Sequence, residues 1–160
     1  MASWAEVEAD APEFAAAVRR LLDAHRHKTL ATLRRDGSPR ISGTEAQFRD
    51  GELWFGGMWL SRKALDLRRD PRFALHSASV DPDDDDPAAW PGDAKLSGRV
   101  EEITDPARVS EVNKDAPPGP SHLFRADITE VVLTKVGSPA DHLLIQWWRE
   151  GKGLRVFKRT

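Results

Sequence analysis

The chain contains no cysteine and no tyrosine among its 160 residues. Without thiols it has no disulfide scaffold, no cysteine-ligated zinc, no iron–sulfur cluster and no cysteine nucleophile. No apolar stretch approaches membrane-spanning length, and the first residues are acidic where a signal peptide carries basic residues and then an apolar run. We therefore expect a cytoplasmic protein without a membrane partner.

An excess of charge of one sign is absent as well. The 24 lysines and arginines nearly balance the 26 aspartates and glutamates, so no global field favours nucleic acid. The five histidines show no metal-ligand spacing, and the run Asp83–Asp86 lacks the glycine and the distal glutamate of a calcium loop. We expect no metal site and no nucleic-acid partner.

Capping and turn residues in the sequence predict one N-terminal helix followed by short strands. The pattern Asp10-Ala-Pro-Glu13 is a variant of the capping box with proline in the first turn, and it predicts a helix that ends near residue 27. Asp-Gly turns at residues 36–37 and 50–51 separate three β-rich runs, which is typical of hairpins. Gly98 interrupts a strand expected over residues 94–103 and indicates a bulge.

The remaining pattern predicts the fold class. Further strands are expected over residues 73–77, 127–136, 142–148 and 154–158, and further helices over 61–70 and 105–113. Six or seven antiparallel strands with about three short helices predict an α+β, mainly β fold, a closed or split antiparallel β-barrel. We expect residues 1–160 to form a single domain, with the N-terminal helix in 1–27 and the barrel in 28–160.

The segment from Gly51 to Pro71 has the strongest functional signal. A short aromatic strand ends in two glycines, and Ser61 can then cap a helix whose first turn carries Arg62 and Lys63. Backbone N–H groups, a hydroxyl and two cations converge there, which suits a phosphate monoester. An ordinary capped surface helix has the same spacing, but cations at a helix N-terminus oppose the helix dipole, a cost that a bound anion would offset.

Two other segments are candidates for ligand contact. The strand from Arg40 to Thr44 has small residues that suit a planar ring lying along the backbone, and a solvated edge strand is the alternative. Trp147 and Trp148 alternate across a strand, so one belongs to the core and the other faces solvent, a ligand or a partner chain. No spacing identifies catalytic residues.

Together these residues resemble the pyridoxamine 5′-phosphate oxidase-like flavin-binding split-barrel family, which implies an antiparallel split β-barrel of Greek-key type. The match runs from about Lys28 to Lys158, and it is most specific over Ser61–Pro71, just after Asp50–Gly56. Proteins of this kind are homodimers that hold FMN at the subunit interface. Some relatives use the deazaflavin coenzyme F420 instead, and others bind haem or biliverdin.

The resemblance implies a role for each candidate. Arg62 and Lys63, helped by Ser61, would hold the cofactor phosphate. Lys95 and Trp148 would approach from the partner chain, and Arg155 or Arg159 would close the site. The residues expected to line the ring and the ribityl chain are Arg40, Ile41, Ser42, Gly43 and Thr44, with Phe55 and Gly56 beside them.

Two departures from the family pattern bear on the reaction. The tail Gly153–Arg159 has no histidine, where pyridoxamine phosphate oxidases carry Arg-Leu-His-Asp-Arg, and Glu45 stands where those oxidases carry a lysine. Vitamin B6 oxidation is therefore not expected. We expect a homodimeric FMN-dependent oxidoreductase with an unidentified small-molecule substrate. An F420-dependent reductase and a non-catalytic flavin- or haem-binding protein are the alternatives. The acidic tail of F420 would need a basic groove beyond Lys63, which Arg68, Arg69 and the basic residues of the C-terminus could supply.

Overall fold

The computed structural model describes residues 2–160, which form four α-helices, one short 3₁₀ turn and eight strands. No helix in this range is both long enough and apolar enough to cross a membrane. In chain order the elements are α1 (Trp4–Asp10), α2 (Pro12–Asp23), β1 (His27–Leu33), β2 (Pro39–Arg49), β3 (Glu52–Met58), α3 (Arg62–Arg69), β4 (Arg72–His76), η1 (Pro87–Ala89), β5 (Asp93–Glu102), α4 (Pro106–Val112), β6 (Ser121–Val136), β7 (Leu143–Arg149) and β8 (Gly153–Arg159).

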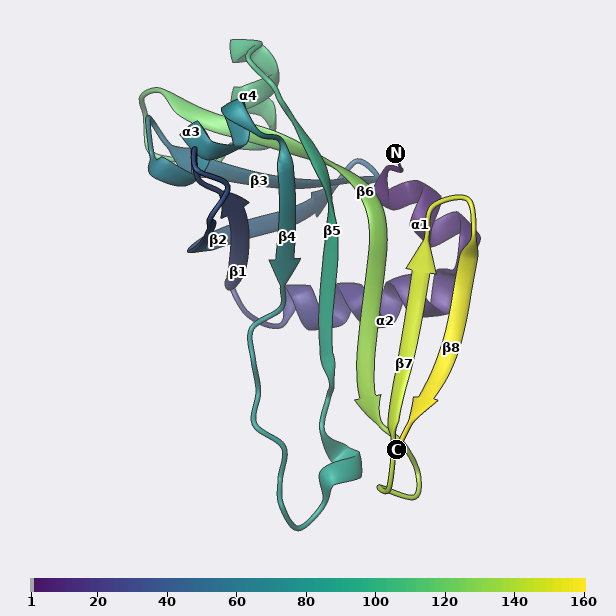
Figure 1. The fold of residues 1–160 in the computed structure, drawn as a ribbon. Coiled ribbons are helices and arrows are strands. Elements are labelled where there is room, and N and C mark those ends of the chain that lie inside the picture. Colours follow the sequence, from purple (N-terminus) through teal and green to yellow (C-terminus); the bar gives the residue numbers. More distant parts are fainter. Residues whose placement is uncertain (1) are drawn as a thin grey trace.

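The strands form one antiparallel sheet that closes on itself. Their order is β3-β2-β1-β4-β5-β6-β7-β8, and β3 pairs a second time with β6. Six strands therefore make a barrel, and β7 and β8 extend from it as a hairpin (Figure 1). The 16-residue strand β6 permits this, because its first half closes the barrel against β3 and its second half pairs with β7. The predicted mainly β, split-barrel fold is confirmed.

The N-terminal segment differs from the prediction. Two helices replace the single one, and α1 begins with a capping box formed by Ser3 and Glu6. Asp10 does not cap α2, whose N-cap residue Ala11 offers no side-chain acceptor. The carboxylate of Asp10 accepts a hydrogen bond from Trp148 Nε1 at 2.7 Å instead. A tertiary partner 138 residues away thus replaces the local cap that the pattern suggested.

The helices α1 and α2 pack against the barrel, and their buried side chains join its core. Trp4 lies on Phe48 with ring centroids 4.5 Å apart. Deeper in the barrel, Phe55 contacts the rings of Phe73 and Phe124 at centroid distances of 5.3 and 6.1 Å. This continuous apolar cluster gives the surrounding strands a rigid base.

Gly98 forms the predicted bulge in β5. The pairing of β5 with β6 shifts register between Ser97 and Gly98. A Cβ at Gly98 would overlap the carbonyl oxygen of Asp127 and lie 3.1 Å from the Cα of Ile128. Only glycine lets the backbones of β5 and β6 approach this closely.

We predict that Gly98→Ala lowers the free energy of unfolding by about 2 kcal/mol, because the added methyl group must displace backbone atoms. Gly43→Ala is the matched control, since a Cβ there meets no atom within 4 Å and Gly43 has no positive φ. Urea unfolding followed by circular dichroism measures both variants. Equal stability of the two would contradict the packing argument.

Candidate functional site

The helix α3 is held on the barrel by the buried carboxylate of Asp66. This side chain is 5% exposed and accepts hydrogen bonds from Thr32 Oγ1 in β1 at 2.9 Å and from Arg40 Nε in β2 at 2.7 Å. Arg69 of the same helix adds a third donor at 3.1 Å. Burial opposes ionisation, but the three donors outweigh it and lower the pKa of Asp66. The start of α3 is therefore fixed relative to β1 and β2.

The first turn of α3 carries donors without acceptors. Ser61 precedes the helix, yet its side chain caps no backbone N–H, and its Oγ is buried with no hydrogen-bond partner. Arg62 is exposed and forms no hydrogen bond or ion pair with any of residues 2–160. Backbone N–H groups in a first helical turn also lack intrahelical partners. At the other end of α3, by contrast, Arg68 and Arg69 are paired with carboxylates.

Lys63 is held beside these donors by neutral groups. Its Nζ donates to the carbonyl oxygen of Gly43 at 2.9 Å and to Thr44 Oγ1 at 3.2 Å. Burial lowers the pKa of Lys63, and the more distant charge of Glu45 only partly opposes this. Within residues 2–160 no carboxylate forms an ion pair with Lys63. Its positive charge thus lies against β2, next to the start of α3, and no carboxylate of residues 2–160 neutralises it.

Two glycines bring β3 close to this turn. A Cβ at Gly57 would lie 3.1 Å from Ser61 Oγ and 3.6 Å from Lys63 Cε. At Gly56 it would lie 3.2 Å from the carbonyl oxygen of His122. The two glycines thus let β3 pack closely against the turn before α3 and against β6. Phe55 has its side chain in the core and presents none of it at the surface.

The strand β2 presents two different faces. Arg40, Ser42 and Thr44 lie on the side of α3, and Arg40 is engaged by Asp66. Ile41 and Gly43 lie on the outer side, where Ile41 is 74% exposed. The residues next to them on the outer side of the sheet are also small. The register aligns Gly43 with Thr29 of β1, and it aligns Ile41 with Ala31 of β1, Ala74 of β4 and Ser97 of β5. This outer face has little relief beside the first turn of α3.

Lys95 lies on the same outer face, further along the sheet. Strand register places one row of residues across seven strands, in the order Gly43, Thr29, His76, Lys95, Val132, Trp147 and Arg155. Trp147 donates from Nε1 to Glu130 at 3.0 Å. Trp148 points to the opposite side and is 3% exposed in the core. This burial does not fit the expected cofactor contact of Trp148, and Trp147 is the tryptophan on the face of Lys95.

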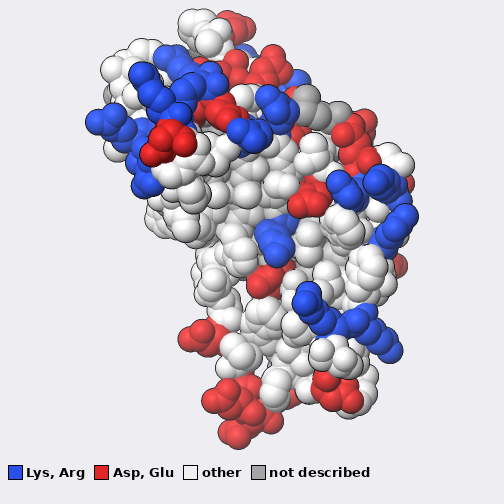
Figure 2. All heavy atoms as spheres, viewed as in Figure 1, with Lys and Arg blue, Asp and Glu red and all other residues white. Residues whose placement is uncertain are grey.

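The charge distribution distinguishes the two ends of the molecule. Figure 2 shows many Lys and Arg side chains, with some acidic ones among them, at the end that carries α3, and a cluster of acidic side chains at the opposite end. The acidic end contains the loop between β4 and β5 with Asp81 and the run Asp83–Asp86. Nowhere in residues 2–160 do three His, Asp or Glu side chains form a group that could hold a metal ion. The basic end is therefore the place for an anion.

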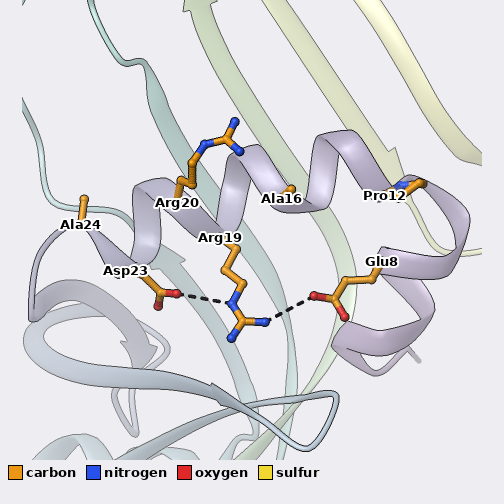
Figure 3. A pocket seen from close by; sticks show the side chains of 7 residues that line it. All are labelled: Glu8, Pro12, Ala16, Arg19, Arg20, Asp23 and Ala24. Carbon is orange, nitrogen blue, oxygen red and sulfur yellow. Dashed lines mark hydrogen bonds and ion pairs between the residues drawn. The ribbon is translucent and has the colours of Figure 1, made fainter.

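A surface hollow along α2 shares no residue with this site. Its lining includes Glu8, Arg19 and Asp23 (Figure 3). Arg19 bridges the two carboxylates at 3.5 and 3.4 Å and lies over the ring of Phe48. The charge of Arg19 is thus balanced by these two carboxylates.

Residues 14–135 match the family model described as pyridoxamine 5′-phosphate oxidase. No curated protein matches the chain. Among solved structures, a pyridoxamine 5′-phosphate oxidase-related, FMN-binding protein from Nostoc punctiforme is 13% identical with a TM-score of 0.63, covering 100% of this chain and 98% of its own. An F420 reductase is 22% identical with a TM-score of 0.51, covering 71% and 94%. General Stress Protein 26 from Bacillus anthracis is 14% identical with a TM-score of 0.58, covering 74% and 91%. At these identities the likeness is one of fold.

We predict that Asp66→Asn destabilises the protein by about 3 kcal/mol at neutral pH, because Arg40 and Arg69 lose their buried carboxylate. The pKa of Asp66 is lowered by folding, so its contribution is complete at neutral pH and is lost as the pH falls below about 4. Urea unfolding at pH 7 and pH 3 should show a difference between wild type and variant that shrinks in acid.

Glu111→Gln is the control for this measurement. It removes an exposed ion pair with Arg108 within α4 and should cost far less stability at pH 7. If Asp66→Asn were as stable as Glu111→Gln, the buried carboxylate would not be what holds α3.

Proposed function

The chain belongs to the pyridoxamine 5′-phosphate oxidase family, and from that premise we propose that it binds FMN and acts as a flavin-dependent oxidoreductase in a homodimer. The observation that carries the proposal is the buried, unpartnered hydroxyl of Ser61 beside the unpaired guanidinium of Arg62. Burying a polar group without a partner is costly, and an acceptor brought by a ligand removes that cost.

A phosphate monoester fits the donors at the start of α3. Ser61 and the first backbone N–H groups of the helix would donate to its oxygens, and Arg62 and Lys63 would supply two positive charges. The dianion would also offset the unfavourable placement of two cations at a helix N-terminus. FMN ends in such a phosphate, which is the chemical reason for assigning this end of the cofactor to α3.

The outer face of β2 suits the rest of the cofactor. Ile41 and Gly43, with Thr29 and Ala31 beside them, form a surface of low relief on which a planar ring can lie. Bound flavin supplies hydride-transfer chemistry, while the protein supplies position and electrostatics. The residues described around this face include no side chain aimed as a proton donor, so the proposed site binds and orients the flavin and a small-molecule substrate of unidentified structure.

The proposed homodimer is supported by the separation of the candidate contact residues within one chain. Lys95, Trp147 and Arg155 share a row with Gly43, but Thr29 and His76 of two intervening strands separate them from it. A second copy related by two-fold symmetry would bring its own Lys95 and Trp147 to the outer face of β2. We propose that they cover the flavin there, and that Trp147 makes the cofactor contact that the sequence analysis expected of Trp148.

Coenzyme F420 is the second candidate cofactor. Its phosphate would use the same donors, but its acidic tail needs a further basic groove. The sequence suggested Arg68 and Arg69 for that groove, and both are engaged by the carboxylates of Glu102 and Asp66. FMN is therefore the better fit. The absorbance spectrum distinguishes the haem-binding alternative from a flavin-binding protein, because haem gives a Soret band.

We predict that Arg62→Ala combined with Lys63→Ala weakens FMN binding at least about a hundredfold, because two charge-assisted contacts to the phosphate are lost. Riboflavin, which lacks the phosphate, should bind wild type and double variant within about threefold of one another. Quenching of flavin fluorescence measures both affinities.

Arg20→Ala combined with Lys114→Ala is the matched control, since it removes the same charge from α2 and from the segment after α4. FMN binding should remain at the wild-type value. Wild-type affinity for FMN in the Arg62/Lys63 double variant would refute the phosphate site. Tighter binding of F420 than of FMN by the wild type would replace FMN with the second candidate.

We predict that light-scattering measurements find the FMN-loaded protein as a dimer. We also predict that Lys95→Ala loses about tenfold in FMN affinity, because the substitution removes a cation from the partner's side of the site. Lys135→Ala, which removes the same charge from β6, serves as the control. A monomer that binds FMN with full affinity would contradict the shared site.

A further inference from the structure

The segment that joins β3 to α3 is held in an uncommon conformation. Leu60 has a φ of 56°, in the left-handed region that branched side chains seldom occupy. Met58, Trp59 and Leu60 are all exposed, so burial of their side chains does not hold the turn. Ser61, with its unpartnered hydroxyl, follows directly. Whatever holds Leu60 therefore sets the position at which α3 begins.

Two hydrogen bonds hold this turn. The backbone N–H of Ser61 donates to the carbonyl oxygen of Met58 at 3.0 Å, and the backbone N–H of Leu60 donates to a histidine in β6. The backbone N–H of Leu60 donates to Nε2 of His122 at 3.1 Å, and the side chain of His122 is fully buried. On the other side of the ring, Nδ1 lies 2.6 Å from Glu102 Oε1. An imidazole that accepts at Nε2 is neutral and carries its proton on Nδ1, which here donates to Glu102.

The surroundings of the imidazole are closed by two aromatic rings. Trp59 stacks on it with centroids 4.7 Å apart and an interplanar angle of 11°, and Phe124 lies 6.0 Å away on a parallel plane. Arg68 lies over the ring of Trp59 at 5.5 Å. The turn, α3, β5 and β6 thus meet at one buried side chain.

Three charged groups face this cluster from the elements packed around it. Glu102 contacts the ring directly, and Arg68 of α3 donates twice to Glu102, at 2.7 and 3.0 Å. Lys63 lies beyond Gly57, the residue paired with His122 in the β3–β6 register. Burial opposes ionisation of Glu102, but hydrogen bonds from Arg68 and His122 outweigh it and lower its pKa. Glu102 thus stays a carboxylate in mild acid and can stabilise a second proton on the imidazole.

A second proton would change the role of Nε2. Protonated imidazole donates from both nitrogens, so Nε2 could no longer accept from Leu60, and two N–H groups would face each other. The left-handed turn would lose this buried acceptor, and Ser61 would be held less firmly at the start of α3, while Asp66 would still hold the helix on the barrel.

We propose that His122 is a positioning residue for the phosphate site, and that its protonation releases the turn at Leu60 and weakens binding of the cofactor phosphate. The inference rests on the proposed function of α3 and adds its regulation by pH. Only the neutral imidazole accepts from Leu60, so binding of a phosphate cofactor favours neutral His122, and affinity falls when the ring takes up a second proton.

The first test compares FMN affinity at pH 8 and pH 5.5 in wild type and His122→Gln. The carboxamide oxygen of glutamine can accept from Leu60 and does not titrate. The FMN phosphate itself loses charge near pH 6, which weakens binding in both proteins alike. We expect similar affinities at pH 8, and a fall towards pH 5.5 that is about tenfold larger in wild type, equivalent to the loss of one hydrogen bond.

His142→Gln is the matched control, because this histidine also has an acidic partner, Asp141 at 2.7 Å, and lies between β6 and β7. It should keep the wild-type pH dependence. Riboflavin should show no difference between wild type and His122→Gln. Saturable FMN binding with parallel pH curves in wild type and His122→Gln would overturn the inference and leave the proposed function standing. Absence of saturable FMN binding at every pH would overturn both.

A second measurement needs neither ligand nor the glutamine variant. An imidazolium stacked on an indole quenches its fluorescence, so the emission of Trp59 reports protonation of His122 in the free protein. We expect wild-type emission to fall between pH 8 and pH 5, and the fall to be lost in Trp59→Phe. Emission of Trp59 that is constant over this range would show that His122 does not titrate there and would overturn the inference.

Discussion

The buried carboxylate of Asp66 is the interaction on which the candidate site depends. It joins Thr32 and Arg40 of neighbouring strands to α3, so the helix cannot slide or turn on the barrel. Because a buried charge is tolerated only with partners that satisfy it, the three donors around Asp66 have to be arranged together. That arrangement places the first turn of α3 next to β2, where Lys63 reaches the backbone at Gly43.

The cations of α3 then divide into two groups with different surroundings. Those of the last turn, Arg68 and Arg69, are neutralised by Glu102 and Asp66 and serve the structure. Those of the first turn have no carboxylate partner, although a helix N-terminus is the less favourable end for positive charge. The asymmetry has a simple physical explanation if a phosphate completes the first turn. The same division explains why the long acidic tail of a deazaflavin has fewer free partners here than the sequence suggested.

Much of the fold could be predicted because it rests on local chemistry. Asp-Gly turns mark two hairpins, Asp105 and Pro106 mark the start of α4, and Gly98 marks a bulge that no other residue could form. The helix opened by Pro12 was predicted, but α1 before it was not, and the capping role of Asp10 was predicted wrongly, because its carboxylate bonds to Trp148 and not to the adjacent backbone. A local pattern contains no information about a partner brought near by the closing of the barrel.

The sequence by itself determined the strand and turn pattern, the cations at the start of α3 and the presence of one inward and one outward tryptophan. The partners of the charged and polar side chains follow only from the arrangement of the strands and helices in space. Strand register assigns Trp148 to the core and Trp147 to the outer face, pairs Arg40 with Asp66, and brings His122 under the turn at Leu60. The physical reason is that side-chain charges and hydrogen bonds are satisfied by neighbours in space, and in this barrel those neighbours are distant along the chain.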